Sequence, residues 1–115
     1  MMKKELWKRQ LENYDELINK YHWKQEPMLA LINELQANGI SEKFFPSNSH
    51  EALGLSRFKE YPLRTEYNMV FIVYSQKNSK FEIEYFRKEK ILIKTVTEKV
   101  TEKDIRKIEY WLQMI

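Results

Sequence analysis

The chain has 115 residues, 43% of them hydrophobic and 14% aromatic, and its 20 Lys and Arg against 17 Asp and Glu leave a net charge of +3. This length fits one domain with one core, and the aromatic content excludes a wholly disordered chain. The absence of cysteine excludes a disulfide scaffold, a thiolate zinc site and a cysteine nucleophile. No apolar run approaches the ~18 residues of a membrane span. We therefore expect a soluble, cytoplasmic protein, and the abundance of Lys, Ile, Asn and Glu favours a bacterial or phage source.

Two helices joined by a short loop are predicted at the N-terminus. Apolar residues recur every three or four positions over residues 3–23, as on one face of a helix. Pro27 suits the first turn of a second helix. The backbone N–H groups of a first turn have no acceptor within the helix, so the N–H that proline lacks is not missed. This helix should end at Asn38-Gly39, where Gly39 can adopt the left-handed conformation. The two helices should form an antiparallel hairpin.

Residues 41–66 are the hardest part of the chain to interpret. Residues 46–49 have the composition of a turn, and residues 50–54 fit one short helical turn. A short strand is expected near residues 56–60. The segment is too apolar for a free loop, so we expect it to cover one side of the core.

The rest of the chain predicts a meander of strands and a final helix. Residues 67–74 are apolar on both faces of a strand, which favours a central position in the sheet. Residues 81–87 and 91–97 alternate as strands do. Thr101 is a good N-cap with Asp104 three residues on. The predicted class is α+β: an N-terminal helical hairpin, a three- or four-stranded antiparallel meander sheet and a C-terminal helix packed on the sheet.

No recognisable catalytic or cofactor motif is present. Two glycines are too few for a glycine-rich phosphate cradle. His22 and His50 each stand alone in their segments. A base at His50 oriented by Glu51 is one interpretation, and a solvated surface pair is the simpler one. No spacing of His, Asp and Glu supplies the converging ligands of a metal site, so we predict no metal, no cofactor and no enzymatic activity.

Two carboxylates, Glu82 and Glu84, should project from the same face of one strand. Paired carboxylates can divide acid and base roles in catalysis. Their alternation with Phe81 and Ile83 instead favours an ordinary solvated face, with Lys94 lying opposite on the next strand. The remaining interpretation is an acidic ridge that binds a basic partner.

The positive excess lies entirely in residues 77–115, and five basic side chains crowd the two predicted hairpin turns: Lys77, Lys80, Arg87, Lys88 and Lys90. Basic residues interleaved with aromatic ones can bind single-stranded nucleic acid. The small net charge supports only a few phosphate contacts, so this binding should weaken steeply with salt.

The order of two helices, an antiparallel meander and a short terminal helix resembles that of the RelE-type ribonuclease toxins. This resemblance implies RNA binding or cleavage through the C-terminal basic turns. That family also begins with a strand and carries a basic cluster and a terminal Tyr or His, which have no matching positions here. RNA binding or cleavage is therefore the alternative function.

Small, charge-balanced domains without catalytic motifs commonly act by binding another protein. Three Trp and seven Tyr supply candidate anchors. We predict a non-enzymatic protein-binding module, and more specifically a bacterial immunity protein or inhibitor that neutralises a nuclease-type toxin by covering it. The predicted contact residues come from the segment 44–64 and from the acidic strand: Arg57, Phe58, Lys59, Tyr61, Arg64, Glu82 and Glu84.

Overall fold

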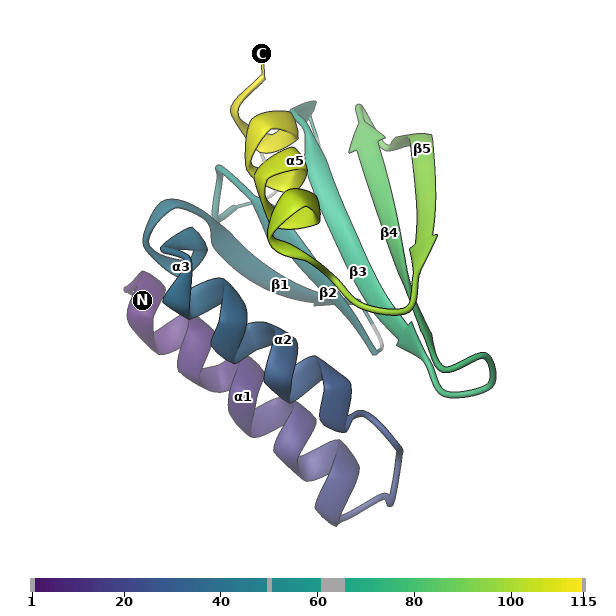
Figure 1. Ribbon diagram of the computed structural model, residues 1–115. Coiled ribbons are helices and arrows are strands. Elements are labelled where there is room, and N and C mark those ends of the chain that lie inside the picture. The colour runs from purple at the N-terminus through teal and green to yellow at the C-terminus, as the bar shows by residue number, and fades with distance from the viewer. Residues whose placement is uncertain (1, 50, 61–65, 115) are drawn as a thin grey trace.

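The computed structural model describes residues 2–49, 51–60 and 66–114. Its helices and strands are, in chain order, α1 (Lys3–Asn19), α2 (Glu26–Ala37), α3 (Ile40–Lys43), β1 (Phe45–Ser49), β2 (Ala52–Ser56), β3 (Met69–Ser75), β4 (Lys80–Arg87), β5 (Lys90–Thr97) and α5 (Glu102–Gln113). Within these residues, five strands form one antiparallel sheet in the order β1-β2-β3-β4-β5 (Figure 1). The predicted α+β class and meander are confirmed, with five strands where three or four were expected.

The predicted helical hairpin is formed by α1 and α2. Helix α1 ends at Asn19 rather than at residue 23, and His22 in the connection has a φ of 59°, a left-handed value that a helix interior does not hold. Pro27 lies in the first turn of α2 as expected. Gly39 follows α2 with a φ of 79°, which confirms its predicted left-handed conformation.

Two hydrogen bonds attach α1 to the β1–β2 hairpin. The indole N–H of Trp7 donates to the carbonyl oxygen of Phe44 at 3.0 Å, and the hydroxyl of Tyr14 donates to that of Glu51 at 2.7 Å. Both aromatic side chains are fully buried, so each polar atom would cost free energy without its partner. The bonds therefore fix the position of α1 along β1.

The segment predicted to be irregular contains α3, β1 and β2 instead. The turn expected at 46–49 is part of β1, and the helical turn expected at 50–54 is wrong because residues 52–54 lie in β2. The strand expected near 56–60 is also wrong, since β2 ends at Ser56. Pairing of Leu53 with Ile72 and of Leu55 with Val70 buries both leucines. Long-range pairing with β3 thus outweighs the local turn composition.

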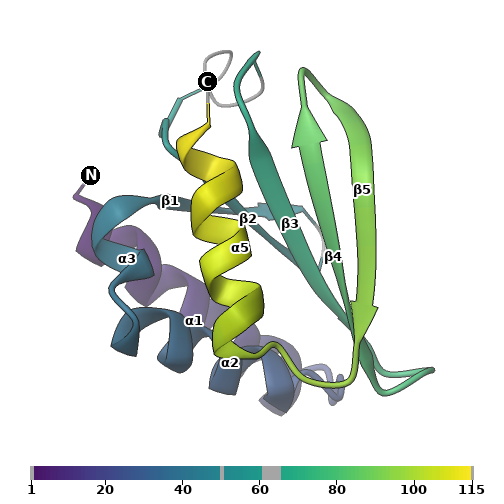
Figure 2. The ribbon, with the colours of Figure 1, turned by 45° about the horizontal axis from the view of Figure 1, so that its top comes forward.

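One face of the sheet carries the core. The two helices of the hairpin and α5 contribute to the same buried cluster as alternate residues of the strands (Figure 2). These strand residues are Leu53, Leu55, Val70, Ile72, Phe81, Ile83 and Tyr85. Strand β3 lies third of the five strands, which confirms its predicted central position.

Helix α5 begins with the predicted capping box. The Thr101 hydroxyl accepts a hydrogen bond from the Asp104 N–H, and the Asp104 carboxylate accepts one from the Thr101 N–H at 2.9 Å. Further along the helix, the indole N–H of Trp111 donates to the carbonyl oxygen of Phe86 at 3.1 Å. This bond ties the last turns of α5 to β4. Among the described helices, none combines the length and the apolar character needed to cross a bilayer.

Candidate functional site on the uncovered sheet face

The candidate site is the face of the sheet opposite the core, which no helix in the described ranges covers. We call it the open face. Strand side chains alternate between faces, so the residues between the core positions lie on it. The pairing register places Phe71 between Gly54 and Glu84, and Phe86 between Met69 and Ile91. The centre of the open face is therefore apolar.

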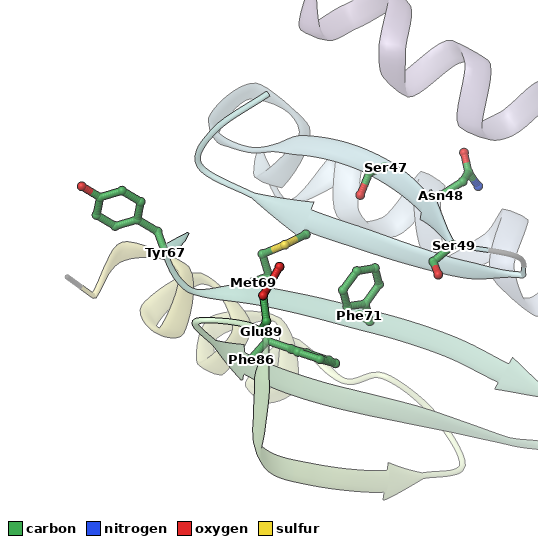
Figure 3. Close-up of a pocket in the computed structure, with 8 residues that line it drawn as sticks. All are labelled: Ser47, Asn48, Ser49, Tyr67, Met69, Phe71, Phe86 and Glu89. Atoms are coloured by element: carbon green, nitrogen blue, oxygen red, sulfur yellow. The ribbon is translucent and has the colours of Figure 1, made fainter. Parts of the chain in front are cut away.

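A hollow of about 280 Å³ lies on this face. The rings of Phe71 and Phe86 meet edge to face in it, with their centroids 5.2 Å apart. Figure 3 shows them between the β1–β2 hairpin and the β4–β5 turn, which carries Glu89. The lining residues are Ser47, Asn48, Ser49, Tyr67, Met69, Phe71, Phe86 and Glu89.

The depth of the hollow depends on Gly54. A Cβ atom at this position would lie 2.8 Å from a ring carbon of Phe71 and 2.4 Å from the Ser47 hydroxyl oxygen. Real Cβ atoms do not come this close to other heavy atoms, so a side chain here would displace the ring. Because residue 54 is glycine, Phe71 packs directly onto β2 and forms the floor of the hollow.

The two carboxylates predicted on one strand face do lie on the open face. Glu82 forms an ion pair with Lys94 at 3.3 Å, which confirms the expected cross-strand lysine. Both acidic side chains are half-buried rather than fully solvated. No basic group in the described part of the chain forms an ion pair with Glu84 or Glu89. Lys94 lies directly opposite Glu84 in the strand register, but its ammonium group pairs with Glu82. Among the described residues, Glu84 and Glu89 therefore have no ion-pair partner of their own beside the apolar centre of the open face.

Two other predicted contact residues adjoin the hollow. The guanidinium of Arg57 lies 5.4 Å from the ring of Phe58 and 5.7 Å from that of Tyr67, and the two rings are tilted by 38° with centroids 4.8 Å apart. Because Tyr67 lines the hollow, this cluster forms one end of the open face.

The remaining predicted contact residues are less informative. Lys59 makes an exposed ion pair with Glu60 at 3.7 Å, which contributes little to stability. Tyr61 and Arg64 lie outside the described residues.

The basic residues predicted to bind nucleic acid do not form one patch. Lys77 and Lys80 lie at the β3–β4 turn, whereas Arg87, Lys88 and Lys90 lie at the β4–β5 turn (Figure 1). These turns are at opposite ends of the eight-residue strand β4, which spans roughly 25 Å. A single strand of nucleic acid would have to follow the whole length of β4 to reach both groups.

Arg87 is used within the fold. Its guanidinium lies 5.1 Å from the Trp111 ring, and its Nε donates to the side-chain oxygen of Asn68 at 3.2 Å. Asn68 is buried and donates in turn to the carbonyl oxygen of Trp111 at 2.8 Å. This network lies on the helix side of the sheet, so Arg87 does not neutralise the open face.

Strand β5 extends the exposed apolar surface. Four of its apolar side chains are between 40% and 53% exposed: Ile91, Leu92, Ile93 and Val96. Ile93 lies opposite Tyr85 on the helix side of the sheet, and it is exposed because α5 packs against β3 and leaves the outermost strand uncovered. Within the described chain no strand pairs with the outer edge of β5, which therefore presents unpaired backbone groups.

Metal chemistry finds no support in the described residues, where no three His, Asp or Glu side chains converge. His22 is exposed in the α1–α2 connection, and His50 lies outside the described residues. The functional candidates that the sequence did not single out are Met69, Phe71, Phe86 and Glu89. Met69 and Phe71 could have been identified from the sequence, because residues 67–74 are apolar on both faces of the predicted strand.

Comparisons of the chain with protein-family models, with curated proteins and with solved structures find no match.

Proposed function

We propose that the protein is a non-enzymatic protein-binding module whose open face binds a basic partner protein. The observation that carries this proposal is an uncovered sheet face with an apolar centre and two carboxylates, Glu84 and Glu89, that lack ion-pair partners among the described residues. Contiguous exposed apolar surface with a polar rim is typical of protein interaction sites. The carboxylates supply the charge complementarity that speeds encounter and selects the partner.

The specific form that we propose is a bacterial immunity protein or inhibitor that neutralises a nuclease-type toxin by covering it. Nucleases bind a polyanion, so their substrate clefts are basic. The open face, which has carboxylates beside an apolar centre, is complementary in charge to such a cleft. Nucleic acid itself is a poorer fit for this face, because Glu84 and Glu89 would repel phosphate groups.

Affinity capture from the native host tests the proposal. The full chain should capture a specific protein, and the double variant Glu84→Lys, Glu89→Lys should lose it while remaining folded, with only the small loss of stability that a lysine opposite Lys94 causes. The matched control is Glu5→Lys, Glu12→Lys, which makes the same change of net charge on the exposed side of α1 and should retain the partner.

The activity of the captured protein then tests whether the chain is an inhibitor of a nuclease-type toxin. The captured protein should cleave nucleic acid when expressed alone and stop when the chain is added. If the Glu84→Lys, Glu89→Lys variant still captures the partner, the open face is not the binding surface. Capture of RNA that depends on Arg87, Lys88 and Lys90 would favour the alternative function.

A further inference from the structure

We propose that the hollow of the open face binds an arginine side chain of the partner protein. This inference rests on the proposed function and names the group that anchors the partner.

The size of the hollow suits a single side chain. This hollow measures about 280 Å³ and opens on a sheet surface, which places it at the small end of the roughly 300–1,000 Å³ found for pockets of drug-sized ligands. Interfaces between proteins commonly place one long side chain in a pocket of this kind, and arginine is among the residues that contribute most to such contacts.

The chemistry of the lining favours a cation with a flat face. Three aromatic residues line the hollow, Tyr67, Phe71 and Phe86, and Glu89 is its one charged lining residue. Aromatic ring faces attract cations, and a carboxylate forms a paired hydrogen bond with a guanidinium. Arginine is favoured over lysine because its planar group stacks on rings and offers five N–H donors.

The polar edge of the hollow supplies acceptors for the remaining donors. Ser47 and Ser49 line it from β1, and Asn48 lies between them. A guanidinium bound to Glu89 keeps N–H groups that point elsewhere, and the hydroxyl and amide oxygens can accept hydrogen bonds from them. A purely apolar side chain would leave these groups and the carboxylate without partners.

The backbone at Glu89 is an independent observation. Lys88 and Glu89 have φ values of 49° and 65°, and they form the two-residue turn between β4 and β5. Such turns favour Asn-Gly, because a larger side chain is strained in left-handed backbone. A glutamate therefore occupies a position where glycine is less strained, and it places its carboxylate at the hollow. Strain of this kind indicates a functional side chain.

Among the described residues, the two arginines at this end of the sheet do not line the hollow. The guanidinium of Arg57 lies over the rings of Phe58 and Tyr67, and that of Arg87 lies over Trp111 on the helix side. No arginine of the described ranges thus occupies the floor formed by Phe71 and Phe86.

A titration of the full chain with small peptides tests the inference without any partner protein. The probe is acetyl-Gly-Arg-Gly-amide, followed by two-dimensional ¹⁵N–¹H NMR. The control peptide carries citrulline, which keeps the shape of arginine but has no charge. We expect saturable shifts at Phe71, Phe86 and Glu89 with the arginine peptide, and affinity for the citrulline peptide lower by about tenfold.

A pair of variants localises the effect. Glu89→Gln should weaken arginine binding at least about fivefold, whereas Glu98→Gln, an equally exposed site beyond the end of β5, should leave it unchanged. Equal affinity for the two peptides, saturable shifts confined to another surface, or no loss in Glu89→Gln would each overturn the inference.

The inference and the proposed function fail in different experiments. If the partner is lost on charge reversal of the open face but the arginine peptide does not bind, the hollow is not an arginine site. If the arginine peptide binds as expected but the charge-reversed variant still captures the partner, the proposed function is wrong.

Discussion

The hydroxyl of Tyr14 in α1 donates a 2.7 Å hydrogen bond to the carbonyl oxygen of Glu51, in the connection between β1 and β2. This bond holds the outer hairpin of the sheet against the helical layer. The variant Tyr14→Phe should lower the free energy of unfolding by about 1–3 kcal/mol, because it leaves a carbonyl group without its partner. Urea titration measures this change, and an unchanged midpoint would show that the bond does not anchor the hairpin.

Two core tyrosines should make the fold sensitive to alkali. Burial, and secondarily the charge of Asp104, raises the pKa of Tyr85 to about 12. Burial also raises the pKa of Tyr14, with a smaller contribution from Glu51. An unfolded tyrosine has a pKa near 10. The free energy of unfolding therefore keeps its full tyrosine contribution below pH ~10. It falls as the pH rises from 10 through 12, because these tyrosines lose their hydroxyl protons at lower pH in the unfolded chain than in the folded protein.

Urea titrations between pH 8 and pH 11 test whether the free energy of unfolding falls as the pH rises. Each tyrosine can contribute a slope of up to about 1.4 kcal/mol per pH unit. Lysines also titrate in this range, so Tyr85→Phe is the control, and its stability should fall less steeply with pH than that of the parent. Parallel curves for the two proteins would contradict the assignment.

The variant Gly54→Ala should destabilise the protein by about 1–3 kcal/mol, because the added methyl group meets the Phe71 ring at 2.8 Å. The closer contact, with the Ser47 hydroxyl, is relieved by rotation of a short side chain, so the ring causes most of the cost. In a Phe71→Leu background the same change should cost much less, since alanine is otherwise the better strand residue. Urea titration of the four proteins gives the coupling energy. An equal cost in both backgrounds would show that Phe71 is not the residue displaced.

The variant Glu89→Gly should raise the free energy of unfolding by up to about 1 kcal/mol, as relief of left-handed strain outweighs the entropy that glycine adds to the unfolded chain. It should at the same time lose binding of the arginine peptide. Lys90→Gly is the matched control, because it places glycine in the adjacent strand, where it should destabilise by roughly 0.5–1 kcal/mol. Thermal unfolding distinguishes the two, and a destabilised Glu89→Gly would contradict the account of the turn.

Local signals in the sequence predicted local structure well. Pro27, Gly39 and the Thr101–Asp104 pair mark helix ends through groups within a few residues, and all of them are found as predicted. The β1–β2 hairpin was missed, because its serines and Pro46 have turn propensity. These residues lie in β1, which pairs with β2, and β2 pairs in turn with β3 about twenty residues further along the chain.

The open face could be predicted only in part. The apolar character of both faces of β3 correctly indicated a central strand, but which face the helices leave uncovered depends on how they pack together. The hollow also requires Gly54 to lie opposite Phe71, which is a matter of register between distant segments. The separation of the basic residues, by contrast, follows from the meander itself, because successive hairpin turns lie at opposite ends of a sheet.

Site-specific photo-crosslinking in the native host is the most direct test of the central claim, that the open face binds a protein. A photoreactive residue at Glu84 or at Ile91 should yield one covalent adduct with the same protein, and the same residue at Glu12 on α1 should yield none. Adducts from Glu12 alone, or adducts with RNA in place of protein at the open-face positions, would contradict the claim.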